Sequence, residues 1–294
     1  MKVYVFAVFA AMTLAVNSNA QKKTDRERDG LIGAIHKIRS EWTEAGEKRW
    51  NDVIYDEKGN KVSREDYDTN GQLGRLSFKY DSFGKLLEST SIIGSQQYKT
   101  EYSYDDRGNL IAKAHYDSGG SPSRSVYKYD ARGNNTEALL YDAKGALYAK
   151  IISSFDADAK LTKSISYDGD HSIKEILIQV YDKKGEKTAT HHLNDKEGLI
   201  SKEVVDEKGR LIEFIKYDES GQISGKQVTS YDRYGSVDEV SQYDGKGSLE
   251  SAQMYKYEVD SSGNWVKKSV SIKDKNGKIN PIPNSTITRA ITYY

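Results

Sequence analysis

The stretch Tyr129-Asp130-Ala131-Arg132-Gly133 carries the motif that decides the fold, Tyr-Asp-x-x-Gly. The Tyr-Asp pair occurs twelve times along the chain, and eleven of the twelve copies have Gly four residues after the Tyr. Neighbouring copies, degraded ones included, mostly lie 11 to 16 residues apart. A repeat held at one period indicates an array of similar structural units.

Each copy is predicted to form a hairpin turn. Asp at the first position of a type I turn can bond its carboxylate to the backbone two residues further on. Gly at the fourth position adopts a positive φ without strain, and the result is a common three-residue hairpin with a bulge. The residues assigned to this structural role are Asp105, Gly108, Asp130, Gly133, Asp142, Gly145, Asp218 and Gly221.

Between the turns, apolar and polar residues alternate, as a half-buried strand requires. Leu110, Ala112 and Tyr116 are spaced by even numbers and are expected to share one face. The predicted fold is all-β: an extended antiparallel β-hairpin repeat array of about 18–20 strands in a single sheet. Neighbouring strands twist by about 20–25°, so the sheet should coil or roll, with Tyr and Leu on its concave face. Whether the sheet closes on itself stays open.

These repeats resemble the YD-repeat (Rhs-repeat) family, whose units consist of a Tyr-Asp turn, a Gly and a short strand. The resemblance covers residues 50–277 and rests on the held period. Large members of the family build hollow β-shells around toxin cargo, which implies a shell-like sheet here. In length, and in the lack of a recognisable cargo domain, the chain is more similar to the small secreted YD-repeat proteins of bacteria. The resemblance therefore implies an architecture and leaves the ligand open.

Residues 1–20 are typical of a secretory signal peptide. A positive residue, Lys2, precedes an apolar run over residues 3–16, and a small residue, Ala20, ends the segment. The run is short for a membrane span, although an uncleaved anchor is the alternative. We expect cleavage after Ala20 and a secreted or periplasmic protein with no membrane span after signal removal.

The rest of the chain divides into an N-terminal capping segment, residues 21–54, a repeat array, residues 55–277, and a C-terminal capping strand, residues 278–294. Residues 21–29 are highly charged and are expected to be disordered. Residues 31–42 fit either a helix or a strand, and a strand followed by a hairpin at residues 44–47 is favoured. The capping segment should cover the first edge of the sheet, because open edges recruit other strands.

Composition excludes several classes of partner and site. The 44 basic and 44 acidic residues balance, which argues against a nucleic-acid partner. The chain has no Cys, so an exported protein must fold without disulfides or a thiol nucleophile. No Gly-x-Ser-x-Gly elbow is present. We therefore predict no catalytic, cofactor-binding or metal-ligating residues.

Histidine and carboxylate residues are the remaining candidates for chemistry. The five His residues have no metal-ligand spacing, and His191 and His192 would point to opposite faces of a strand. Calcium-loop patterns are also absent. Carboxylate pairs such as Asp105-Asp106 could suggest a glycosidase, but a turn Asp is engaged by its own turn. The Asp pairs are thus expected to be structural.

The abundant Tyr residues allow two interpretations. Tyr offers a flat apolar ring and a hydroxyl, as sugar-binding and protein-binding surfaces do. Tyr held in register with a turn also fixes strands by cross-strand packing. We expect a non-enzymatic binding or scaffold protein with a glycan or an envelope protein as partner. The alternatives are an Rhs-like shell component associated with a toxin and a two-carboxylate glycosidase.

Overall fold

The computed structural model describes residues 23–117, 120–279 and 285–294. The expected signal peptide and its cleavage after Ala20 lie outside these residues. The described chain contains one short helix, α1 (Asp25–Arg28), and twenty strands. The strands are β1 (Ile35–Glu44), β2 (Glu47–Tyr55), β3 (Lys61–Asp68), β4 (Gly71–Tyr80), β5 (Leu86–Ile93), β6 (Gln96–Tyr104), β7 (Leu110–Tyr116), β8 (Ser123–Tyr129), β9 (Asn135–Tyr141), β10 (Leu147–Phe155), β11 (Leu161–Asp168), β12 (Ile173–Tyr181), β13 (Lys187–Leu193), β14 (Leu199–Val205), β15 (Leu211–Tyr217), β16 (Ile223–Tyr231), β17 (Val237–Asp244), β18 (Leu249–Val259), β19 (Trp265–Asp274) and β20 (Ser285–Tyr293).

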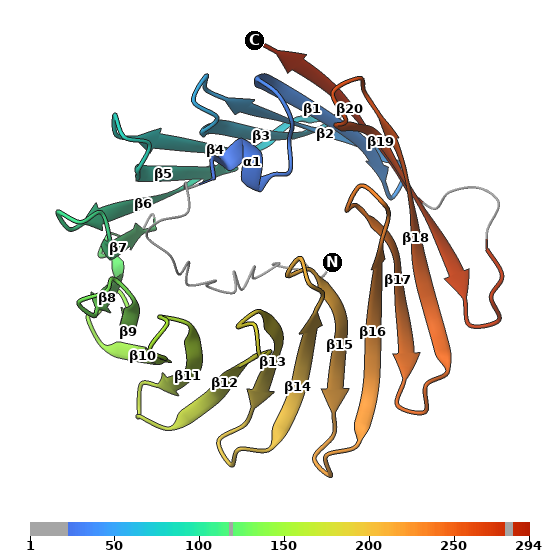
Figure 1. Ribbon diagram of the computed structural model, residues 1–294. Coiled ribbons are helices and arrows are strands. Elements are labelled where there is room, and N and C mark those ends of the chain that lie inside the picture. Colours follow the sequence, from blue (N-terminus) through green and yellow to red (C-terminus); the bar gives the residue numbers. More distant parts are fainter. Residues whose placement is uncertain (1–22, 118–119, 280–284) are drawn as a thin grey trace.

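The strands form one closed antiparallel sheet (Figure 1). Each strand pairs with the next one in the sequence, and β1 also pairs with β20, with Glu41 opposite Thr288. The prediction of an all-β array of about 18–20 hairpin strands is confirmed. The open question of closure is answered as well. The first and last strands cover each other's edges, which is the most complete protection against strand addition.

A register shift beside most of the repeat turns changes which residues share a face. Tyr104 lies opposite Leu110, but the preceding Ser103 lies opposite Ala112, so Ile111 is taken up as a bulge. When one residue is absorbed in a bulge, every later side chain of that strand points to the opposite face of the sheet from the one that simple alternation predicts. Leu110 therefore faces the same side as Tyr104, whereas Ala112 and Tyr116 face the other side. The prediction that Leu110, Ala112 and Tyr116 share one face is wrong for this reason.

Consequently the repeat tyrosines divide between the two faces of the sheet. One face, which we call the inner face, carries α1 and lies inside the ring of strands (Figure 1). The expectation that all repeat tyrosines lie on the concave face is correct only for alternate repeats. Register places on the inner face Tyr55, Tyr80, Tyr104, Tyr129, Tyr181 and Tyr231, and on the outer face Tyr67, Tyr116, Tyr141, Tyr167, Tyr217 and Tyr243.

The turns likewise divide between the two ends of the ring. The inner tyrosines precede the turns at one end, which we call the α1 end because α1 contacts the turn after β2 there. The outer tyrosines precede the turns at the opposite end, which we call the far end. Consecutive hairpins in an antiparallel meander turn at opposite ends, so two repeats, and not one, form the period of the structure.

The N-terminal segment differs in part from its prediction. The favoured strand is confirmed as β1, and the hairpin that follows turns at Ala45-Gly46. The expected disorder of residues 21–29 is wrong for α1. Thr24 accepts a hydrogen bond from the backbone of Glu27, and the Glu27 carboxylate accepts one from the backbone of Thr24. This capping box satisfies the free donors of the first turn and stabilises even a very short helix.

The compact apolar core is small and lies where the ring closes. Leu31, Ile35, Ile38 and Tyr55 are buried there, with Val53 packed against them. Most of the other strand residues are half-buried or exposed. The ring is therefore held largely by backbone ladders and cross-strand side-chain pairs, and its interior is available for contacts other than a packed core.

Candidate binding site on the inner face

The predicted turn residues all take part in one recurring hydrogen-bond pattern. In the turn after β8, Gly133 N donates to the Asp130 carbonyl at 3.1 Å, and Asp130 N donates to the Asn134 carbonyl at 2.9 Å. The Asp130 carboxylate accepts bonds from Arg132 N and Asn134 N, both at 2.9 Å. The other assigned positions show the positive φ of such a turn, 85° at Gly108, 86° at Gly133, 81° at Gly145 and 78° at Gly221.

These turns lie apart from one another. Asp105 and Asp130 are in turns at the α1 end, whereas Asp142 and Asp218 are in turns at the far end. Each of the four carboxylates accepts backbone hydrogen bonds within its own turn. Their geometry suits a turn, and their predicted role in stability rather than in binding stays a prediction.

The structural role of the asparagine that follows the turn glycine was not predicted from the sequence. Nδ2 of Asn134 donates to Oδ2 of Asp130 at 2.8 Å, and Asn60 and Asn109 make the same bond to their own turn Asp. These bonds hold the pKa of the Asp130 carboxyl below its usual range. The signal was present as a recurring Asn directly after Gly, and it is found mainly at the α1 end.

The inner tyrosines at the α1 end form a ladder of hydroxyl-to-backbone hydrogen bonds. Each hydroxyl reaches the carbonyl of the first residue of the strand that immediately precedes its own strand. The donors and acceptors are Tyr104 to Leu86 at 2.8 Å, Tyr129 to Leu110 at 2.7 Å, Tyr181 to Leu161 at 2.8 Å and Tyr231 to Leu211 at 2.9 Å. The expectation that tyrosines fix the strands is thus met at this end by specific hydrogen bonds.

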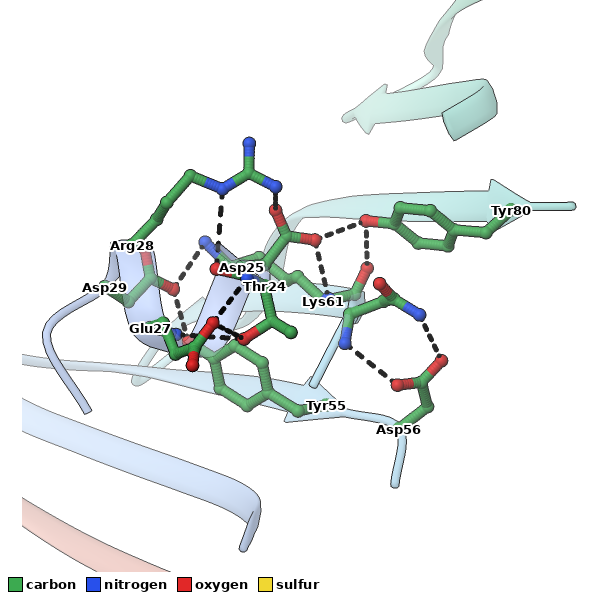
Figure 2. A network of polar contacts seen from close by, with 10 residues as sticks. Thr24, Asp25, Glu27, Arg28, Asp29, Tyr55, Asp56, Lys61 and Tyr80 are labelled. Atoms are coloured by element: carbon green, nitrogen blue, oxygen red, sulfur yellow. Dashed lines mark hydrogen bonds and ion pairs between the residues drawn. The ribbon is translucent and has the colours of Figure 1, made fainter. Parts of the chain in front are cut away.

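Two carboxylates anchor helix α1 to two further inner tyrosines, Tyr55 and Tyr80 (Figure 2). Oδ2 of Asp25 lies 2.7 Å from the Tyr80 hydroxyl and accepts a bond from Lys61 N at 3.0 Å. Asp29 accepts a hydrogen bond from the Tyr55 hydroxyl and pairs with Lys61 Nζ at 2.9 Å. Burial and these carboxylates raise the pKa of Tyr55 and of Tyr80, so both hydroxyls remain donors at neutral pH.

A cavity of about 590 Å³ lies between α1 and the inner face. Tyr80, Tyr102 and Tyr104 supply aromatic surface, and Lys113 and Arg28 supply positive charge. This volume is within the usual range of small-molecule sites. The cavity is the place where the fold gathers aromatic rings and polar groups on its concave side.

Lys113 gives this cavity a specific chemistry. Its Nζ lies 5.8 Å from the ring centroids of both Tyr102 and Tyr127. Burial lowers the pKa of the Lys113 ammonium below its usual range. Cation–π contacts of this kind stabilise the charge without a carboxylate partner. The ammonium therefore keeps its hydrogen-bond donors available for a ligand that offers hydroxyl or carbonyl oxygens.

The histidines and acidic residues in the described part of the chain form no metal-binding group. No group of three His, Cys, Asp or Glu residues there could hold a metal ion. His192 and His191 point to opposite faces, and His192 Nδ1 lies 2.8 Å from Oε1 of Glu175 on the inner face. Asp105, considered for a glycosidase pair, is engaged by its own turn.

No helix within the described residues is long and apolar enough to cross a membrane.

Comparison with known proteins supports the repeat assignment. The Teneurin YD-shell family model matches residues 44–145 of this chain. No curated protein matches the sequence. Among solved structures, the chain is similar to a chain of TcdB2-TccC3-Cdc42, with 13% identity and a TM-score of 0.37 over 80% of this chain. It spans only 15% of the length of that chain.

The chain is also similar to two porin-like proteins. For the protein from Bacteroides uniformis, the identity is 12% and the TM-score 0.38, over 88% of this chain and 96% of that chain. For the protein from Bacteroides vulgatus, the identity is 11% and the TM-score 0.31, over 88% of this chain and 98% of that chain.

Proposed function

Since this chain is built from YD repeats, we propose that it is an exported, non-enzymatic shell-like scaffold that binds a glycan on its inner face. The observation that carries the proposal is the cavity beneath α1, where Tyr80, Tyr102 and Tyr104 lie beside Lys113. Tyrosine rings offer flat apolar surface to the CH faces of a sugar, and their rims offer hydroxyls. The ammonium and the Asn60 amide add donors for sugar oxygens.

Two further observations favour binding over catalysis. Lys113 has no carboxylate partner among the described residues, so its donors are free for a ligand. The turn carboxylates are engaged by backbone donors, which leaves them poorly placed as an acid and base pair. The expected signal peptide favours export, and an exported protein of the cell envelope meets glycans directly.

Binding to a glycan array, followed by calorimetry on each hit, tests this proposal. Tyr102→Ala should weaken binding by about tenfold or more, because the loss of an aromatic platform removes stacking and cation–π contacts. Tyr98→Ala is the matched control, since Tyr98 lies on the same strand and the same face but nearer the far end. No binding by the wild-type protein, or equal losses in the two variants, would contradict the proposal.

A hydrolysis assay on the same glycans separates binding from the glycosidase alternative. We expect no product, because no free pair of carboxylates faces the cavity among its lining residues. Turnover that is abolished by replacing an acidic residue would favour the enzyme instead.

A second function, a shell component associated with a toxin, is favoured by the YD-shell family match and by the closed sheet. A toxin or immunity gene in the neighbouring reading frame, together with co-purification of its product, would support this function over glycan binding.

A further inference from the structure

A second cavity, of about 240 Å³, lies on the inner face where the ring closes. It is bordered by β1, β2, β3 and β20 and by the segment that follows α1. Its lining includes three cationic side chains, Lys61, Arg64 and Arg289, and one carboxylate, Asp29. The lining therefore carries an excess of positive charge in a partly closed space.

Two of these cations are neutralised within the protein. Arg64 donates from Nε and Nη2 to the Asp66 carboxylate, at 2.7 to 3.1 Å. Lys61 Nζ pairs with Oδ2 of Asp29 at 2.9 Å. The same Asp29 oxygen also accepts the hydrogen bond from Tyr55. The one carboxylate of the lining is thus already shared between two donors.

Arg289 is different from the other two. Its side chain makes no hydrogen bond or ion pair to any residue that the structure describes, and its buried Nε has no hydrogen-bond partner. The guanidinium is stacked on Trp265, 3.4 Å from the ring centroid. Burial lowers the pKa of Arg289 to about 10, so the group is still charged at neutral pH.

This arrangement leaves a half-buried guanidinium that feels the charge of the nearby Asp29 carboxylate but forms no hydrogen bond with it. A buried cation without a partner is costly, and proteins pair such groups with an anion or hydrogen-bond them. Stacking on Trp265 covers one face of the guanidinium plane, and the N–H donors lie along its edge. An edge of parallel N–H donors matches the two oxygens of a carboxylate, sulfate or phosphate.

We propose that this second cavity binds a small oxyanion, a carboxylate, sulfate or phosphate, through the guanidinium of Arg289. The Ser40 hydroxyl and the Asn51 amide in the lining supply further donors for its oxygens. The site joins β20 to β1 and β2, so the bound anion stabilises the closure of the ring. It shares no residue with the proposed glycan cavity, and either site can exist without the other.

Anion binding to the full chain tests this proposal. Sodium phosphate, sodium sulfate and sodium acetate are each compared with sodium chloride at equal ionic strength, by thermal unfolding and by calorimetry. A ligand that binds only the folded state raises the unfolding temperature as its concentration rises. We expect at least one of the three oxyanions to bind and to raise the unfolding temperature above that in chloride. The strongest of the three identifies the class of anion.

Variants of Arg289 assign the effect to this cavity. Arg289→Gln should weaken oxyanion binding by about 30-fold or more, because it removes the buried charged donor. Arg289→Lys keeps the positive charge but loses the parallel N–H donors of the guanidinium. This variant should therefore fold, but it should bind the oxyanion more weakly than wild type does. Arg233→Gln is the control, since Arg233 is exposed in the turn after β16, and it should bind as wild type does.

Two results overturn the proposal. One is that none of the three oxyanions binds the wild-type protein more tightly than chloride does, a result that needs no variant. The other is that Arg289→Lys and Arg289→Gln both bind as tightly as wild type, which would place the anion elsewhere.

Discussion

Positive backbone φ is the most demanding condition that the fold imposes on single residues, and Gly133 is the clearest case. A Cβ built there would lie 3.9 Å from Oδ1 of Asn109, so there is room for it. The cost of Gly133→Ala therefore comes from the backbone, where φ is +86°, and should be about 1–2 kcal/mol. Denaturant unfolding measures it. A variant as stable as wild type would show that the turn relaxes without strain.

The same argument predicts stabilising substitutions where a repeat lacks its glycine. Glu197 closes the turn after β13 with φ of +62°, because Asn194 takes the Asp place of that turn. Glu197→Gly should raise the free energy of unfolding by about 0.5–1 kcal/mol, the relief of strain less the added freedom of the unfolded chain. Ala159→Gly, at φ of +61°, is an independent replicate. A loss of stability in both variants would contradict the account.

At the scale of elements, each hydrogen bond of the tyrosine ladder ties the end of one strand to the beginning of the strand just before it. Tyr104→Phe removes the hydrogen bond to the Leu86 carbonyl and should cost about 1 kcal/mol in denaturant unfolding. Tyr141→Phe is the matched control, because Tyr141 precedes a far-end turn and no bond from its hydroxyl to the described residues is present. Equal costs for the two variants would mean that the ladder adds nothing beyond ring packing.

The repeat made the hairpin elements predictable, because Asp and Gly at fixed spacing specify a turn by local chemistry alone. The repeat did not predict which side chains of each strand point to the inner face and which to the outer face. The shift beside Tyr104 depends on a bulge at Ile111, and nothing in the alternation of Leu110, Ala112 and Tyr116 reveals where an extra residue is absorbed. The cavities were equally hidden, because Lys113 and Arg289 become neighbours of their aromatic partners only through pairing between strands.

At the scale of the whole molecule, the turn carboxylates should determine the pH below which the free energy of unfolding falls. Hydrogen bonds within their turns lower the folded-state pKa of Asp105, Asp130, Asp206 and Asp218. A lowered folded-state pKa adds stability above the unfolded pKa, about 3.9 for Asp, and this is lost as the pH falls through the folded value. The free energy of unfolding should therefore fall steeply below about pH 4.

Denaturant unfolding at a series of pH values between 7 and 2 measures this dependence. Asp130→Asn, which cannot titrate at that position, should show a smaller loss than wild type over the acid range. An equal loss in the variant and in wild type would mean that Asp130 is not among the groups responsible.

Closure of the sheet underlies both cavities, because each lies on the inner face of a ring that β1 and β20 complete. Closure could not be predicted from the sequence, since the pairing of β1 with β20 joins strands that are more than 240 residues apart. The chain has no native Cys, so an introduced pair of cysteines reports on this seam without interference.

The most direct test is therefore a disulfide between the first and last strands. Glu41 and Thr288 lie opposite each other, and opposed positions on antiparallel strands have Cα separations that a disulfide can span. Oxidised at low concentration, the Glu41→Cys, Thr288→Cys protein should form an intramolecular bond, seen as linked peptides by mass spectrometry. The control pair, Glu41→Cys with Lys163→Cys on β11, should keep two free thiols. Free thiols in both proteins would contradict a closed ring.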